Sequence, residues 1–152
     1  MSRGDDFSPA SQRAAPGSWG DVAARAPVRS PISLVRMSES SCLFCKIASG
    51  TIPADLVHAD ERLVAFRDIA PQAPVHLLVV PREHIASLEA ASERHADMLG
   101  ALLLVARKIA REQGLSERGY RTVINTGAEG GQTVQHLHLH LLGGRTMEWP
   151  PG

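Results

Sequence analysis

The sequence predicts an α+β fold: a mostly antiparallel, five-stranded sheet with one long and one short helix. Five short apolar runs read as strands, and only one long segment has helical spacing. Most of the connections are short, which favours antiparallel neighbours because parallel strands need a long crossover between them. A chain of 152 residues, 43% of them hydrophobic, is sufficient for one domain with a core.

The short elements follow local signals along the chain. A short helix is expected after Ser41, which can cap it, and Gly50 suits its C-terminal end. Five runs of β-branched and apolar residues, bounded by turn residues, are expected as strands. They cover residues 56–58, 62–67, 75–80, 120–125 and 135–142. The first two flank an Asp60-Glu61 turn and are therefore expected to form a hairpin.

The long helix is expected from about Glu93 to Gln113. Ser92 can cap its first turn, and Gly114 suits its end. Apolar residues recur along this segment at the spacing of one helical face, which indicates core packing. They are Met98, Leu99, Leu102, Leu103, Val105, Ala106, Ile109 and Ala110.

Composition excludes several classes of partner. Sixteen basic and sixteen acidic residues give no net charge, which argues against duplex DNA or an anionic membrane as a bulk electrostatic partner. The longest apolar run is far shorter than a membrane span. The only cysteines, Cys42 and Cys45, have a spacing that is typical of a metal pair or redox motif and poor for a structural disulfide. A reducing cytoplasm is the expected location.

The first 40 residues differ from the rest. They are rich in Ser, Ala, Arg, Pro and Gly and have no sustained period. We expect either a disordered tail or a mis-annotated extension whose true start is Met37, with a targeting peptide as a third alternative. Asp5, Asp6 and Asp21 count against targeting. Residues 41–152 are expected to form the one domain.

Three histidines at alternate positions are the strongest functional signal. His136, His138 and His140 alternate with leucines, so in a strand all three imidazoles lie on one face. A neutral imidazole is a competent nucleophile near pH 7, and a neighbouring ring can donate a hydrogen bond to an anion. The alternatives are a catalytic metal held by the histidines themselves and a surface cluster without function.

A glycine-rich loop precedes the histidines. Residues 127–131 read Gly-Ala-Glu-Gly-Gly, and Gln132 and Thr133 follow them. Glycines allow close approach of a ligand, and successive N–H groups can form an anion-binding nest. Asn125, at the end of the preceding strand, can add a donor. The loop is therefore interpreted as a phosphate cradle.

Several motifs together resemble the histidine triad nucleotide-binding family. His-Leu-His-Leu-His-Leu-Leu at 136–142 matches the family signature, residues 66–76 resemble its ribose-binding segment, and 130–134 its phosphate loop. The ending at 143–152 resembles that of the Hint branch, the purine nucleoside phosphoramidases. The resemblance covers residues 41–152. It implies a histidine triad fold and a hydrolase that cleaves the P–N bond of purine nucleoside 5′-phosphoramidates.

The resemblance also assigns roles to residues. It implies that His138 attacks phosphorus and forms a nucleotidyl-histidine intermediate, that His140, Gln132 and Thr133 hold phosphate oxygens, and that Asp68 binds the ribose. Thr133 stands where the Hint pattern usually has serine. The implied catalytic residues are His136, His138, His140 and Thr133. The implied nucleotide-binding residues are Leu43, Phe44, Ile47, Phe66, Asp68, Ile69, Asn125, Gly131, Gln132, Thr133, His138, His140 and Trp149.

The cysteine pair resembles that of zinc-binding members of the family. The resemblance implies a closed, structural zinc site formed by Cys42, Cys45, His84 and His136, with free buried thiols as the alternative. No metal is expected to be required for the chemistry. His76 competes with His84 as a ligand, and we expect it to steer the triad instead.

The resemblance further implies a homodimer that pairs through the long helix and a strand edge, with Trp149 reaching the neighbouring site. Two alternative functions stay open: a nucleotide-binding regulatory module with negligible turnover and a dinucleoside polyphosphate hydrolase. The remaining histidines, His58 and His95, are expected on the surface.

Overall fold

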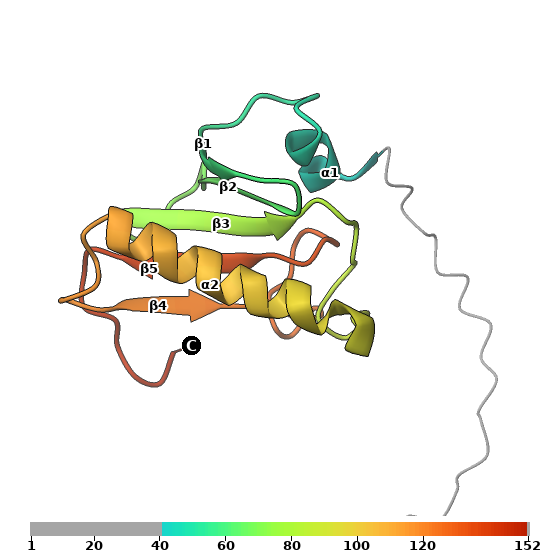
Figure 1. The fold of residues 1–152 in the computed structure, drawn as a ribbon. Helices are drawn as coiled ribbons and strands as arrows, with labels where there is room; N and C mark the ends of the chain where they lie inside the picture. The colour runs from blue at the N-terminus through green and yellow to red at the C-terminus, as the bar shows by residue number, and fades with distance from the viewer. Residues whose placement is uncertain (1–40, 152) are drawn as a thin grey trace, which may run out of the picture. The chain divides into compact units, whose positions relative to one another are not determined.

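The computed structural model describes residues 41–151 (Figure 1). The predictions for residues 1–40 lie outside the described residues. Within the described range, no helix has the length and apolar character required to cross a bilayer.

The described chain contains the two helices and five strands that the sequence predicts, together with one 3₁₀ turn. In order they are α1 (Leu43–Ala48), β1 (Leu56–Ala59), β2 (Leu63–Arg67), β3 (Val75–Pro81), the 3₁₀ turn η2 (Glu93–His95), α2 (Ala96–Glu112), β4 (Tyr120–Val123) and β5 (Leu139–Gly143).

The strands form one antiparallel sheet in the order β1-β2-β3-β5-β4. The hairpin between β1 and β2 is confirmed, and the Asp60 carboxylate accepts the N–H groups of Arg62 and Leu63 at 2.8 and 2.7 Å in its turn. β5 lies between β3 and β4, with His140 opposite Leu78 on β3 and Val123 on β4. The last triad histidine is thereby held in the interior of the sheet.

The two faces of the sheet bury different clusters. Leu77 and Val79 of β3 pack in the larger cluster with α2, whereas Leu78 and Val80 pack in a smaller cluster with α1. This alternation follows from the two-residue period of a strand. Figure 1 shows α2 running across one face of the sheet and α1 beside the β1–β3 side. The α1 side is the one that carries the candidate site.

Two helix starts differ from the predictions. α1 has Cys42 rather than Ser41 as its N-cap residue, and no side chain caps it. The long helical segment begins at Glu93 with Ser92 as its N-cap, as predicted, but its first turn is the 3₁₀ turn η2, in which the Ser92 N–H donates to Nδ1 of His95 at 2.9 Å. The expectation that His95 lies on the surface was wrong: its side chain is buried because it folds back to accept this hydrogen bond.

The histidine strand is shorter than predicted. Only residues from Leu139 belong to β5, so His136 and His138 precede the strand that was expected at 135–142. If pairing with β3 continued beyond Leu139, Leu137 would stand opposite Pro81, whose ring has no N–H to donate. The Leu137 N–H instead donates to the carbonyl of Ile85 at 2.6 Å.

The alternation of histidine and leucine nevertheless persists through this segment. Leu137, Leu139 and Leu141 are buried in the cluster beneath α2. The rings of His136 and His138 lie on the other side, with centroids 6.0 and 5.1 Å from that of Phe44 in α1. The leucines therefore anchor the segment and present the histidines to the opposite face.

A core substitution in α2 tests this packing. Leu102→Ala is expected to lower the free energy of unfolding by about 2–5 kcal/mol, because Leu102 is fully buried and its removal leaves a cavity. Arg107→Ala on the same helix is the control, because the Arg107 side chain is exposed. Its expected change is within about 0.5 kcal/mol. Urea unfolding measures both, and equal losses would contradict the assignment of the α2 faces.

Candidate functional site

The ring of His138 is fixed by the backbone next to it. Its Nδ1 lies 2.6 Å from the carbonyl oxygen of His136, and a carbonyl can only accept. Nδ1 therefore carries the proton, and in the neutral ring Nε2 holds the lone pair. The ring is buried and packs edge-on against Phe44, with centroids 5.1 Å apart. In the neutral ring this arrangement presents Nε2 as an oriented nitrogen with a free lone pair.

His140 stands beside His138 and belongs to a second group of polar side chains. The two ring centroids are 4.9 Å apart. Nδ1 of His140 lies 2.9 Å from Nε2 of His76, which in turn lies 3.4 Å from a carboxylate oxygen of Asp68. β3 carries His76, β5 carries His140, and Asp68 follows β2. Three neighbouring strands of the sheet thus bring these residues together.

Burial keeps the two imidazoles of this group uncharged. Burial, and then the neighbouring rings of His138 and His76, lower the pKa of His140 to about 4, against the opposing effect of Asp68. Burial also lowers the pKa of His76, while the Asp68 carboxylate raises it. Both rings are neutral near pH 7, so each nitrogen acts either as a donor or as an acceptor.

The low pKa of His140 predicts a pH-dependent stability. The unfolded chain takes up a proton at this ring near pH 6.5, and the folded chain only near pH 4. Between these values the unfolded state binds more protons, so the free energy of unfolding is expected to fall as the pH is lowered through this window. Urea unfolding from pH 7 to pH 4 measures the slope. His140→Gln is expected to make it shallower, and an unchanged slope would contradict the assignment.

The glycine-rich loop closes on itself through backbone hydrogen bonds. The N–H groups of Gly131 and Gln132 donate to the carbonyls of Ala128 and Gly127, each at 3.0 Å, and Gly131 has a φ of 75°. A Cβ on Gly131 would lie 3.9 Å from the side-chain nitrogen of Asn125, so Gly131 lies next to the side chain of a residue that follows β4. The predicted cradle is a folded turn.

Gln132 holds the loop in place. Its side-chain nitrogen donates to the carbonyls of Ala86 and Val134 at 2.6 and 3.0 Å, and its oxygen accepts from the Gly127 N–H at 3.2 Å. The predicted contact of its side chain with a phosphate would require these bonds to be exchanged. Thr133, the next residue, is exposed and stays available for that role.

The predicted base-binding residues divide into two groups. Phe44, Ile47 and Phe66 are buried together in the cluster beside α1, with the two phenyl centroids 5.6 Å apart. Leu43 and Ile69 are exposed, to 45% and 100%. The buried group forms an apolar floor next to His138, and the exposed pair offers apolar surface to a ligand.

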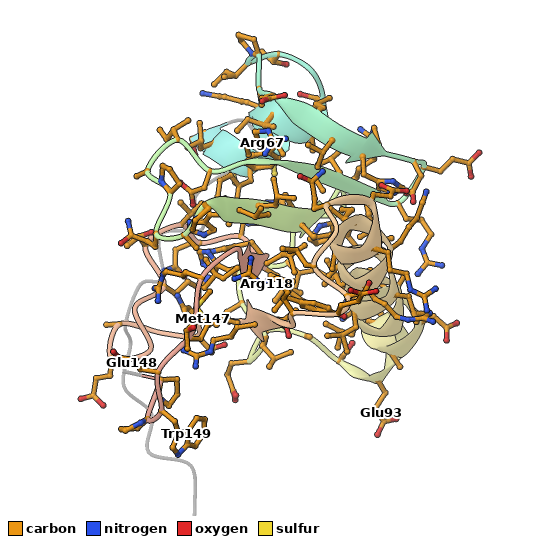
Figure 2. The ribbon with its side chains drawn as sticks, turned by 90° about the vertical axis from the view of Figure 1, so that its left-hand side faces the viewer. Arg67, Glu93, Arg118, Met147, Glu148 and Trp149 are labelled. Carbon is orange, nitrogen blue, oxygen red and sulfur yellow. The ribbon has the colours of Figure 1, made fainter. Side chains whose placement is uncertain are left out.

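Trp149 does not join the other predicted site residues. Its side chain is 84% exposed, and Figure 2 shows it on the C-terminal segment, pointing away from the sheet. The segment is attached through Arg121 of β4, which donates to the carbonyl of Glu148 at 2.5 Å. In a single chain Trp149 is therefore a free apolar surface.

Four side chains converge as a metal site requires. Around Nδ1 of His136, Cys42 Sγ and Cys45 Sγ each lie at 3.4 Å and His84 Nδ1 lies at 3.2 Å. All four ligand atoms lie within 4.8 Å of one another. Tetrahedral zinc with its usual bond lengths sets such atoms about 3.3–3.8 Å apart. The three distances from His136 Nδ1 to its neighbours therefore match the edge lengths of a tetrahedral metal site better than they match a set of hydrogen bonds.

The protonation of His136 also fits a ligand. Its Nε2 donates to the Pro81 carbonyl at 2.8 Å, so Nδ1 keeps its lone pair and points at the cysteines. Burial lowers the pKa of His136 to about 4, against the opposing effect of the Pro81 bond, so the ring is neutral as ligation requires. The second nitrogen of a ligating histidine is commonly anchored in this way.

Comparison with known proteins shows which family this arrangement belongs to. Residues 41–149 match the family model described as "Scavenger mRNA decapping enzyme C-term binding". An uncharacterized HIT-like protein of Synechococcus elongatus is 59% identical over 116 residues, which are 76% of this chain and all of that protein. The chain belongs to the histidine triad family.

Two further relatives of this histidine triad protein carry functional names. The 14 kDa zinc-binding protein of Zea mays is 50% identical over 122 residues, 79% of this chain and 94% of that protein. Adenylylsulfatase HINT1 of Arabidopsis thaliana is 50% identical over 117 residues, 76% of this chain and 79% of that protein.

Solved structures share the histidine triad fold. A HIT family hydrolase from Legionella pneumophila superposes with a TM-score of 0.72 at 55% identity, over 73% of this chain and 99% of that one. A zinc-bound histidine triad family protein from Mycobacterium smegmatis gives a TM-score of 0.63 at 34% identity, over 73% and 80% of the two chains.

Sequence reasoning missed the backbone groups of this histidine triad site. The carbonyls of His136 and Pro81 and the N–H of Gln72 each fix the proton of one imidazole. Every residue type supplies such groups, so no sequence pattern identifies them. Only Pro81 leaves a signal, since a proline after an apolar strand indicates where the ladder ends.

Proposed function

We propose that this histidine triad protein hydrolyses the P–N bond of purine nucleoside 5′-phosphoramidates, in the manner of the Hint branch. The observation that carries the proposal is the fixed tautomer of His138, whose unprotonated Nε2 lies beside His140 above an apolar floor. Nucleotidyl transfer needs a nucleophile, a hydrogen-bond donor to the phosphate anion and an apolar surface that fits a nucleobase.

The reaction proceeds in two displacements. Nε2 of His138 forms a bond to the α-phosphorus as the P–N bond breaks, and the leaving amine takes up a proton from solvent, which the Thr133 hydroxyl can pass on by donating its own proton and accepting another. Water then attacks the same phosphorus and gives up a proton to solvent, the bond to His138 breaks, and the nucleoside monophosphate is released. His140 donates from Nε2 to a phosphate oxygen, where negative charge increases in the transition state.

The remaining residues bind the nucleoside. Phe44, Ile47 and Phe66 offer the apolar floor for a purine, and Leu43 and Ile69 extend it. Asp68 accepts hydrogen bonds from the ribose hydroxyls through the oxygen that is not engaged by the Ala70 N–H at 2.8 Å. Asn125 and Gly131 line the phosphate loop.

A relative supports a second leaving group. Arabidopsis HINT1 is named an adenylylsulfatase, which is a hydrolase of an adenylyl conjugate with sulfate instead of an amine. The same attack of His138 on phosphorus serves both leaving groups. They differ only in whether the leaving atom must take up a proton. We propose the phosphoramidate as the preferred substrate, because an amine needs the proton that the Thr133 hydroxyl can help to deliver.

Steady-state kinetics with matched substrates tests this proposal. Adenosine and guanosine 5′-phosphoramidates of one amine, adenylyl sulfate and a dinucleoside polyphosphate are compared on the full chain. The expected order of kcat/KM places the phosphoramidates first. Preference for the dinucleotide, or binding of nucleotide without turnover of any substrate, would contradict it.

We further propose a homodimer and a structural zinc ion. Tyr120 lies on the edge strand β4, and exposed apolar residues of α2, Leu103 and Leu104, support pairing of two copies. Trp149 then reaches the neighbouring site. When bound, zinc would cross-link α1 to the segment before β5 and supply no step of the reaction. Its two thiolates must stay reduced, which fits the cytoplasm.

A further inference from the structure

A second histidine-rich cluster, formed by Asp68, His76 and His140, has the composition of a metal site. Its ligand atoms all lie within 4.8 Å of one another, as those of the cysteine cluster do. Two histidines and one carboxylate form a common site for transition metals. The positions of the protons distinguish the two clusters.

A backbone group determines which nitrogen of His76 carries the proton. The backbone N–H of Gln72 donates to Nδ1 of His76 at 3.1 Å, so Nδ1 is an acceptor. A neutral imidazole with an acceptor at Nδ1 has its proton on Nε2. In the cysteine cluster the ring of His136 is held with its lone pair pointing inward, whereas here the ring of His76 is held with its proton pointing inward.

That proton determines the state of His140. Nε2 of His76 lies 2.9 Å from Nδ1 of His140 and 3.4 Å from the Asp68 carboxylate, so the shorter bond goes to the ring. Nδ1 of His140 then accepts, and its Nε2 carries a proton. This Nε2 is buried and has no partner in the part of the chain that the structure describes. A buried donor without a partner is costly unless a ligand accepts from it.

We infer that His76 is a positioning residue: the Gln72 N–H sets which nitrogen of His76 carries the proton, and His76 in turn sets which nitrogen of His140 does. His140 is thereby an obligatory hydrogen-bond donor to an anionic ligand. The same proton positions exclude a metal ion from this cluster. This inference rests on the proposed function and explains why a phosphate oxygen can bind at Nε2 of His140. A cation here would need a lone pair from His76, which the Gln72 N–H already occupies.

Nitrogen-15 NMR of the histidine rings in the full-length wild-type protein tests the relay without any substrate. The expected spectrum shows the proton on Nε2 in both His76 and His140. Titration with zinc is expected to saturate at one ion per chain. A proton on Nδ1 of His140, or a second zinc ion that disappears in His76→Gln, would overturn the inference.

Kinetics of two substitutions separate positioning from packing. His76→Phe keeps an aromatic ring but removes the donor, and its kcat is expected to fall about tenfold with little change in KM; losing a direct donor to the developing charge costs about 10²–10³. His76→Gln places an N–H near the position of Nε2 and is expected to recover most of the rate. His58→Gln, in the distant His58–Asp60 pair of 2.9 Å, is the matched control and is expected to behave as the wild type.

The outcomes separate this inference from the proposed function. If the wild type cleaves phosphoramidates and His76→Phe retains both its kcat and the tautomer of His140, the relay is overturned. If the wild type cleaves none of the substrates, the proposed function fails, and the NMR spectrum and zinc stoichiometry still decide the relay.

Discussion

Replacement of His138 by alanine is expected to abolish turnover while nucleotide binding stays measurable. The substitution removes the atom that attacks phosphorus, and loss of a nucleophile costs at least about 10³-fold in kcat. The apolar floor around Phe44 and Phe66 and the carboxylate of Asp68 are untouched. Binding of a nucleoside monophosphate, measured by calorimetry, is therefore expected to change by less than about tenfold.

The control for His138→Ala is the same substitution at His58. His58 lies on β1 and pairs with Asp60, away from the triad. His58→Ala is expected to leave kcat and KM unchanged. Undiminished turnover in His138→Ala, with the protein folded as judged by circular dichroism, would contradict the assignment of the nucleophile.

The second large effect concerns the cysteine cluster. His84→Ala removes one of the four ligand atoms around the proposed zinc and is expected to yield protein with little bound metal. A ligand present at about a thousand times its Kd stabilises the folded state by about 4 kcal/mol. For a domain of this size that loss corresponds to a decrease in Tm of about 15 °C or more.

Calorimetry with metal analysis measures this effect, and chelation of the wild type is expected to reproduce it. His58→Ala, which removes a histidine that no metal cluster uses, is expected to keep both the metal and the Tm. Turnover is expected to persist in chelated protein below its lowered Tm, because none of the four ligands is the attacking atom. A wild type whose Tm does not respond to zinc or chelator would contradict a structural metal.

Periodicity predicted most of the fold. Apolar runs bounded by turn residues located all five strands, and helical spacing located α2, because burial on one face imposes those periods. The prediction failed for the histidine segment. Alternation continues through His136 and His138, but strand pairing stops at Leu139, since the partner strand ends in a proline.

The sequence predicted which side chains form the candidate site, but not which ring nitrogens of its histidines carry protons. The spacing of Cys42 and Cys45 and the resemblance to the family identified the four side chains that the structure brings together. The role of Gln132 in holding the loop and the burial of His95 depend on segments distant in sequence or on a local fold-back. The states of His76, His138 and His140 depend on backbone carbonyls and amides, which carry no residue-specific signal.

The most direct test of the central claim is the mass of the intact protein, followed by peptide mapping, after brief reaction with a phosphoramidate and a rapid quench. The account predicts a nucleotidylated form whose phosphorus–nitrogen bond maps to His138 and which is absent from His138→Ala. Protein that cleaves the substrate at the expected rate but repeatedly yields no adduct at this residue would contradict it.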